Sequence, residues 1–209
     1  ATKLDRPEDV QVNPLTGRVY VMLTNNVDRQ EPNVANPRPN NRHGHVVELI
    51  PPYHAREHSA DTFDWNFFLV GGDPSEPGLQ TKYHEDVSDT GWLTCPDNVA
   101  FDRNGRIWIA TDQGGMQDET GVADGIYAAD TRGAGRALTR KFCSVPVGAE
   151  ACGPRFTPDC STLFVAVQHP AERSTRDNPS TRWPDFQDEM PPRPAVIAIT
   201  KKDGGVIGT

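Results

Sequence analysis

The sequence predicts an all-β protein of the β-propeller class, and three observations support that prediction. A strand–turn–strand pattern occurs three times, in segments that start at Arg6, Cys95 and Cys152. Glycine and proline are abundant, with 18 and 19 residues in a chain of 209, which indicates many turns. The apolar content of 35% is modest and suits short strands better than a helical bundle. Repeated units built from strands are typical of propellers and related arrays.

The clearest of the three segments spans residues 95–112. Val99 and Phe101 alternate with polar neighbours, as expected of a half-buried strand. The tetrapeptide 102–105 ends in glycine and predicts a turn, and residues 107–109 form an apolar run rich in strand-forming side chains. The segment is therefore expected to be a hairpin, whose two outer ends lie side by side at one edge of a sheet.

Aromatic residues occupy equivalent positions in the second strand of each hairpin. They are Tyr20, Trp108 and Phe164. A large apolar side chain that recurs at one position of a repeat indicates a packing role. We therefore expect all three rings to lie in the core.

Four strands, from one hairpin to the next, make one propeller blade. We expect one partial propeller over residues 1–209, with long loop insertions and about three four-stranded blades at approximately 5–74, 95–147 and 152–209. The final segment GGVIGT predicts the start of a fourth strand in the last blade. Propellers usually close with about four to eight blades. The remaining blades are therefore expected from another part of the same protein or from another chain.

Composition and charge exclude some classes of partner. The formal net charge of −8 argues against nucleic acid or an anionic membrane as a partner. The chain has no apolar run long enough to predict a membrane span. The N-terminal segment ATKLDRPED does not resemble a signal peptide, so the chain is expected to be processed or to begin within a longer protein.

The cysteines do not form a recognisable metal motif. None of the four lies in a CxxC pair, which argues against a zinc ribbon. We favour the interpretation that they are small buried apolar residues over a metal-binding or disulfide role. The residues are Cys95, Cys143, Cys152 and Cys160.

Acidic and amide side chains recur at the ends of the predicted hairpins. Carboxylates at close range cannot all remain ionised without a cation. Calcium takes about six to eight oxygen ligands, and a carboxylate-rich set also suits ferric iron or manganese better than zinc. The alternative is that these acids only cap turns. The candidate metal ligands are Glu8, Asp97, Asn98, Asp112 and Glu150.

Arg6 precedes Glu8 by two positions, so both side chains point the same way in an extended strand. Arginine offers a planar fork that matches the oxygens of a phosphate group. The spacing is compatible with a phosphate-binding arginine beside a metal-binding carboxylate. It is equally compatible with a surface arginine at the start of a strand.

Together these motifs resemble the C-terminal half of PhoX-type alkaline phosphatases. The resemblance covers nearly the whole chain and implies a secreted or periplasmic six-bladed propeller. It also implies hydrolysis of phosphate monoesters with ferric iron and calcium. The resembling segments are RPEDVQVNPLTGRVYVMLTNN, NPRPNNRHGHVVEL, the PDNVAFD–GRIWIATD hairpin and VPVGAEACGPRFTPD–TLFVAVQHP.

The resemblance also implies roles for individual residues. Arg6 is expected to contact phosphate and Glu8 to bind metal, both as catalytic residues. Because part of the ring is missing, the isolated chain is expected to bind calcium weakly and to hydrolyse little. The remaining residues with implied roles are the metal ligands Asp97, Asn98, Asp112 and Glu150, and the substrate-binding residues Asn25 and Asn26.

Two other functions fit the same pattern. Calcium-dependent lactonase-like propellers share the P-D-x-x-x-D-x-x-G-x-ϕ-W hairpin pattern, where ϕ is an apolar residue. A non-catalytic propeller module that binds partners through its long loops is the third possibility.

Overall fold

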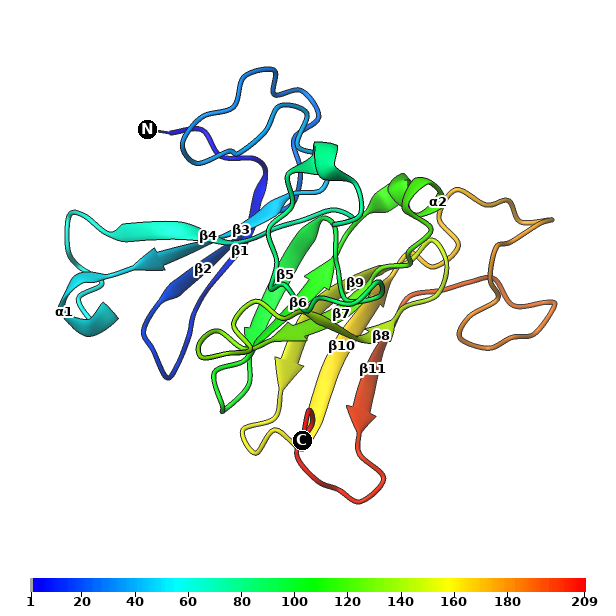
Figure 1. Cartoon of the computed structure of the whole chain (residues 1–209). Coiled ribbons are helices and arrows are strands. Elements are labelled where there is room, and N and C mark those ends of the chain that lie inside the picture. The colour runs from blue at the N-terminus through cyan, green and yellow to red at the C-terminus, as the bar shows by residue number, and fades with distance from the viewer. Residues whose placement is uncertain (1) are drawn as a thin grey trace.

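A computed structural model describes residues 2–209 and shows an all-β chain with three antiparallel sheets (Figure 1). Every strand pairs with its neighbour in the sequence, so each sheet is a meander. The all-β prediction is confirmed. The first sheet contains β1 (Pro7–Val12), β2 (Val19–Leu23), β3 (His45–Ile50) and β4 (Asp64–Val70). The second contains β5 (Pro96–Phe101), β6 (Ile107–Thr111), β7 (Gly125–Ala129) and β8 (Arg140–Ser144). The third contains β9 (Glu150–Phe156), β10 (Thr162–Gln168) and β11 (Ala195–Thr200).

The tight turns of the three hairpins share one backbone feature. Gly17 and Gly105 have φ angles of 72° and 74°, in the left-handed region that glycine enters without steric cost. The third hairpin has Cys160 at this place, with a φ of 58°. A non-glycine residue in this conformation is uncommon, so the third turn keeps the shape of the other two at some conformational cost.

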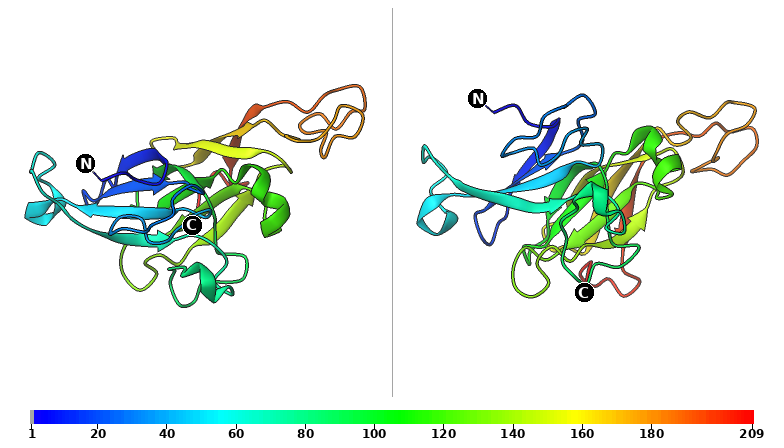
Figure 2. Two further views of the ribbon diagram at one scale, coloured as in Figure 1. Left: turned by 90° about the horizontal axis from the view of Figure 1, so that it is seen from above. Right: turned by 45° about the horizontal axis from the view of Figure 1, so that its top comes forward.

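The first strand of each sheet lies next to the first strand of its neighbour. β5 contacts β1 on one side and β9 on the other. The three sheets follow one another around this shared edge, as two further views show (Figure 2). The start of each hairpin is thereby brought to the same region of the molecule.

The second sheet is buried on both faces, which explains why every residue of β6 is buried. Ile107 and Ile109 pack with Tyr20 in a cluster between the first and second sheets. Trp108 and Ala110 point the other way, as alternation along a strand requires, and pack in a cluster between the second and third sheets.

Phe164 is not in the core, contrary to the expectation from its equivalence to Tyr20 and Trp108. Its side chain is 40% exposed, whereas the other two rings are almost completely buried. The reason is the order of the sheets. Tyr20 faces the second sheet and Trp108 faces the third, so Phe164 faces the side where a further sheet would follow.

The prediction of a fourth strand at GGVIGT is wrong. Residues 201–209 form turns, and the third sheet has three strands within residues 2–209. Ile207 is nevertheless buried against the second core cluster, and its backbone N–H donates to the carbonyl of Cys160. The segment therefore covers the end of the core instead of extending the sheet.

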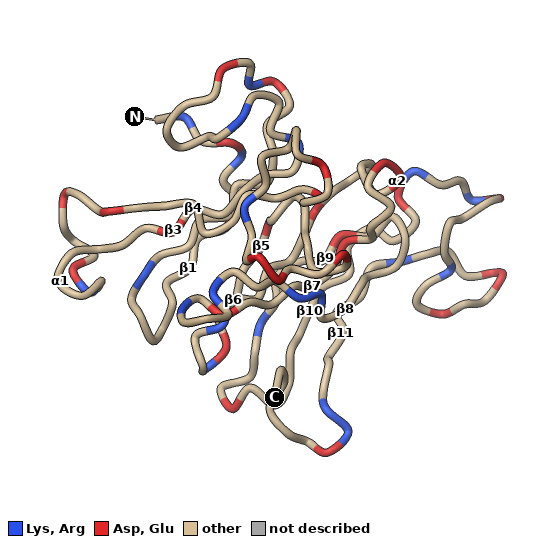
Figure 3. Tube along the Cα trace, viewed as in Figure 1, with Lys and Arg blue, Asp and Glu red and all other residues tan. Residues whose placement is uncertain are grey.

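The connections contain only short helical turns. Three residues of α1 (Pro52–Ala55) have positive φ angles: Tyr53, His54 and Ala55. The others are η1 (Pro77–Leu79), η2 (Gly114–Met116) and α2 (Gln117–Thr120). None of the helices in the described chain is long and apolar enough to cross a bilayer. Acidic and basic positions are interspersed along the trace (Figure 3).

Candidate functional site

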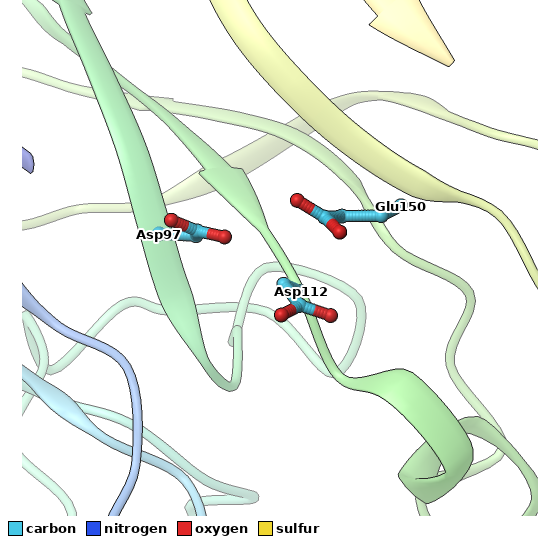
Figure 4. Close-up of side chains that lie close together, drawn as sticks. All are labelled: Asp97, Asp112 and Glu150. Atoms are coloured by element: carbon cyan, nitrogen blue, oxygen red, sulfur yellow. The ribbon is translucent and has the colours of Figure 1, made fainter. Parts of the chain in front are cut away.

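Three carboxylates converge where the second and third sheets meet. Asp97 lies in β5, Asp112 directly follows β6, and Glu150 is the first residue of β9. Each offers an oxygen that lies within 4.8 Å of an oxygen from each of the other two (Figure 4). Two of the three are buried, and Asp112 is half-buried. The expectation that the hairpin ends bring acidic oxygens together holds for these three residues.

A β-bulge places the acidic residue at the start of each of the first two hairpins. The register between β5 and β6 shifts between Pro96 and Val99, and Asp97 lies within this shift. The register between β1 and β2 shifts in the same way between Pro7 and Val10, which includes Glu8. A bulge bends the strand and redirects its side chains, and bulges are common beside functional sites.

Burial and the neighbouring carboxylates disfavour the charged forms of Asp97 and Asp112. Burial, together with the charges of Glu150, Asp112 and Glu8, raises the pKa of Asp97 to about 7. Burial and Glu150 also raise the pKa of Asp112, although Arg6 partly opposes this effect. Buried acids that repel one another are stabilised by a cation. Oxygen donors of this kind suit a hard cation, so these residues fit a metal site.

Arg6 links the first sheet to this cluster. Its Nε lies 2.8 Å from an oxygen of Glu8, and its Nη2 lies 3.4 Å from an oxygen of Asp112. Glu8 is more exposed than the three clustered acids and lies outside their group. The structure therefore pairs Glu8 with Arg6 beside the cluster.

The predicted asparagines lie in different surroundings. The Asn98 amide donates to Asp97 at 3.1 Å, and its oxygen accepts from the backbone N–H of Gly153 at 2.7 Å. Asn25 lines a pocket beside Arg6. The Asn26 oxygen instead accepts backbone N–H groups within its own loop, at 3.0 and 3.1 Å. Asn98 thus positions Asp97, and Asn26 shapes the loop.

Glu150 has three further neighbours that were not among the predicted site residues. Gln168 donates to it at 2.8 Å, and a ring nitrogen of His169 lies 3.2 Å away. Burial acts to lower the pKa of His169, but hydrogen bonds to Glu150 and Gly148 outweigh it and raise the pKa. The thiol of Cys152 donates to Glu150 at 2.8 Å. Cys143 and Cys152 are half-buried, contrary to the expectation that the cysteines are buried, and Cys152 lies beside the acidic cluster.

Asp124 is a further buried acid that the sequence did not single out. It accepts from Thr111 Oγ1 at 2.6 Å, from the Gln113 backbone N–H at 3.0 Å and from the Gln117 amide at 2.8 Å. Burial raises the pKa of Asp124 to about 6 despite these donors. The residue fixes the chain on both sides of Asp112. Its position as the first residue of a strand predicted over residues 124–130 was the available signal.

His43 and His45, which lie on either side of Gly44, form hydrogen bonds with protein groups. A ring nitrogen of His43 lies 2.9 Å from Thr94 Oγ1, and those of His45 lie 2.9 Å from the Asn41 amide and from the Ala35 carbonyl. Burial lowers the pKa of both rings to about 4. Both are therefore neutral structural residues near pH 7.

A comparison with solved structures found a protein of similar fold. The chain resembles a solved structure of Pseudomonas fluorescens PhoX in complex with vanadate, described as a transition state analogue. The TM-score is 0.85 and the sequence identity is 33%, over all of this chain and 36% of that one. The chain thus spans about a third of the length of this relative. No curated protein matches the sequence.

A family model provides the assignment. The model described as alkaline phosphatase PhoX matches residues 1–171, which is most of the chain and includes every predicted site residue. This match favours membership of this family over the lactonase-like and non-catalytic propeller alternatives. The chain belongs to the PhoX alkaline phosphatase family.

Proposed function

We propose that this chain supplies part of a metal-dependent site that hydrolyses phosphate monoesters. The observation that carries the proposal is the cluster of Asp97, Asp112 and Glu150 with Arg6 at its edge. An acidic cluster holds cations, and the adjacent guanidinium supplies the planar fork that phosphate oxygens match. The family and the vanadate complex of the P. fluorescens protein support phosphate as the group that is bound.

Arg6 orients the phosphate in this proposal. Its Nε lies beside Glu8 and both Nη atoms lie 3.4 Å from an oxygen of Asp112, and these contacts limit the freedom of the guanidinium. The planar fork then presents paired donors to the phosphate with little further loss of side-chain entropy. Asn25 lines the same pocket and supplies an amide for the substrate, whereas Asn26 acts by shaping the loop next to it.

The proposed metals are calcium and ferric iron. Asp97, Asp112 and Glu150 are the central ligands, and Glu8 and Asn98 complete the set from the neighbouring strands. Bound metal ions polarise phosphoryl oxygens and lower the pKa of bound water. The all-oxygen donor set of the central three suits calcium. The same carboxylate-rich set also suits ferric iron, which is a hard cation like calcium.

We further propose that the three sheets are blades of a larger propeller, with six blades when complete. Apolar side chains on the two outermost sheet faces support this proposal. Phe164 and Val196 are 40% and 70% exposed on the third sheet, and Val10 and Val12 are 57% and 48% exposed on the first. Exposed apolar rows of this kind suit packing against further sheets. The remaining blades come from the rest of the same protein or from another chain.

We also propose a periplasmic or secreted location. The support is the resemblance of the hairpin motifs to secreted and periplasmic PhoX-type phosphatases. Fractionation of the source cells with an antibody against this chain tests the proposal. Recovery of the protein only from the cytoplasmic fraction would count against it.

The test of the phosphatase proposal uses the intact protein and p-nitrophenyl phosphate as substrate. We expect hydrolysis that is lost in chelator and restored by calcium and ferric iron together. Glu150→Gln keeps the side-chain shape but removes a charge from the cluster, and we expect loss of both activity and bound metal. Glu31→Gln changes an exposed acid in a loop and serves as the matched control. Full activity in Glu150→Gln, or hydrolysis of a lactone instead of the ester, would refute the proposal.

A further inference from the structure

A pocket opens beside the acidic cluster and extends the candidate site. Its lining includes Arg6, Asn25, Arg42, Asp112, Gly115 and Arg173. Its volume is about 350 Å³, at the lower end of the range of roughly 300–1,000 Å³ for small-ligand pockets. The pocket therefore has room for more than the phosphate group that the cluster and Arg6 would hold.

The three arginines of this pocket differ in their partners. Arg6 is paired with Glu8 and Asp112, and Arg42 is paired with Glu119 at 2.6 Å. Within residues 2–209, Arg173 forms no ion pair with a carboxylate. Arg173 is thus the positive charge of the pocket that remains uncompensated.

Gly115 leaves room for the side chain of Arg173. A Cβ atom at position 115 would lie 1.4 Å from Nη1 and 2.0 Å from Cζ of Arg173. Gly115 does not have a positive φ angle, so its backbone does not itself require glycine. Its neighbour Gly114 does, with a φ of 53°. Position 115 must lack a side chain because the guanidinium of Arg173 occupies the space where a Cβ atom would lie.

Arg173 begins the long segment that leads to β11. This segment starts beside η2 and α2 and then extends away from the sheets (Figures 1 and 2). The backbone of Arg173 has a φ of 68°, which is unusual for a non-glycine residue. The family-model match ends at residue 171, so Arg173 lies in a part of the chain that the model does not describe.

We propose that Arg173, assisted by Arg42, binds a second anionic group on the leaving group of the substrate. This inference rests on the proposed phosphatase function. Arg6 and the metal site would hold the phosphate that is transferred, and the pocket would hold the alcohol part. The preferred substrates are then phosphate monoesters whose alcohol carries a carboxylate or a second phosphate. Water replaces the alcohol at phosphorus, the P–O ester bond breaks, and the products are inorganic phosphate and the anionic alcohol.

The test compares matched substrates on the intact protein with its metals. Phenyl phosphate has a neutral leaving group, 4-carboxyphenyl phosphate adds a carboxylate, and 1,4-phenylene bisphosphate adds a second phosphate. The measured quantity is the ratio of kcat/KM in the variant to that in the unmodified protein, taken for each substrate. Comparison within one substrate cancels the intrinsic reactivity of its leaving group.

We expect Arg173→Gln to lower kcat/KM for the two anionic esters about tenfold more than for phenyl phosphate, as loss of a charge-assisted hydrogen bond implies. Comparison of the 4-carboxyphenyl ester with the bisphosphate shows whether hydrolysis of the carboxylate or of the second-phosphate substrate depends more strongly on Arg173. Arg176→Gln alters an arginine of the same loop that does not line the pocket, and its ratios should be equal for all three esters.

Gly115→Ala provides an independent variant that keeps every charge. The added methyl group would displace the guanidinium, which is the far end of a flexible side chain, so folding should be preserved. We expect the same selective loss on the anionic esters as in Arg173→Gln. Equal effects on all three esters in both variants would overturn the inference while leaving the phosphatase proposal intact. Failure to hydrolyse any ester would overturn both.

Discussion

Arg6 and Asp112 lie 106 positions apart in the sequence, yet the guanidinium of one approaches the carboxylate of the other to 3.4 Å. Arg6 directly precedes β1 in the first sheet, and Asp112 directly follows β6 in the second. The contact therefore joins two sheets at the place where the candidate metal and phosphate sites meet. It ties the position of the proposed phosphate-binding group to that of a proposed metal ligand.

The first prediction concerns this arginine. Arg6→Lys keeps the positive charge but removes the planar fork, so the phosphate loses paired donors. We expect kcat/KM for p-nitrophenyl phosphate to fall about tenfold to a hundredfold, the range expected for one charged hydrogen bond. Arg18→Lys is the matched control, because Arg18 pairs with Glu48 away from the cluster. An unchanged kcat/KM in Arg6→Lys would show that the Arg6 guanidinium does not bind the phosphate.

The second prediction is that the difference in Tm between Asp97→Asn and the unmodified protein changes sign when calcium replaces chelator. The pKa of Asp97 is raised to about 7 in the folded protein, so folding favours its protonated form. That contribution to stability is complete below the unfolded pKa and is lost as pH rises through about 7. Asparagine is neutral at every pH and avoids this loss. In chelator at pH 8 we expect a higher Tm for Asp97→Asn than for the unmodified protein.

With calcium we expect the unmodified protein to have the higher Tm. The carboxylate of Asp97 binds the cation and is stabilised by it, whereas the neutral amide of Asp97→Asn is stabilised less. Scanning calorimetry of both proteins at pH 5 and pH 8, with chelator or with calcium, measures the four differences. The advantage of Asp97→Asn in chelator should shrink at pH 5, where Asp97 is largely protonated. A variant that is less stable than the unmodified protein in chelator at pH 8 contradicts the electrostatic account of the cluster.

The third prediction is that calcium affinity rises with pH. Protons and calcium compete for Asp97, whose pKa of about 7 places the competition near neutrality. We expect the dissociation constant to fall between pH 5 and pH 8, by up to about tenfold per unit where one proton is displaced. Isothermal titration calorimetry in buffers of different ionisation enthalpy also measures the protons released. Affinity that is independent of pH would show that Asp97 is not a ligand.

The fourth prediction concerns the exposed face of the third sheet. If a further sheet covers Phe164 in the intact protein, Phe164→Ser removes buried apolar area and costs about 1.5–3 kcal/mol of unfolding free energy. Val34→Ser changes a more exposed apolar residue in a loop and should have little effect. Denaturant unfolding of both variants measures the difference. Equal stabilities would indicate that Phe164 remains in solvent and that no blade packs there.

Short-range patterns in the sequence predict the strands and the position of the site well. Alternation around Val99 and Phe101, and the glycine turn at Gly105, define a hairpin with local information only. Strand pairing then brings Asp97 and Asp112 to one edge without knowledge of the rest of the fold. Glu150 lies just upstream of the third hairpin as the repeat defines it, and its place in the cluster follows from the extension of β9 back to residue 150.

Features that depend on neighbouring sheets were not predictable in the same way. Phe164 is exposed because no strand of the described residues covers its face of the third sheet, and its own strand pattern does not record this. Ile207 is apolar at the right spacing for a strand, but a hydrogen bond to Cys160 and packing between sheets fix it in a turn. The support of Asp112 by Asp124 arises from contacts between loops, which no periodicity in the sequence records.

The three clustered carboxylates belong to two different sheets, because Asp97 and Asp112 come from the second sheet and Glu150 from the third. A cation held by all three would cross-link the two neighbouring sheets. Removal of the ion would then weaken the contact between these sheets before the strands themselves unfold. The same protein would be rigid where its metal is plentiful and open to proteases where it is scarce.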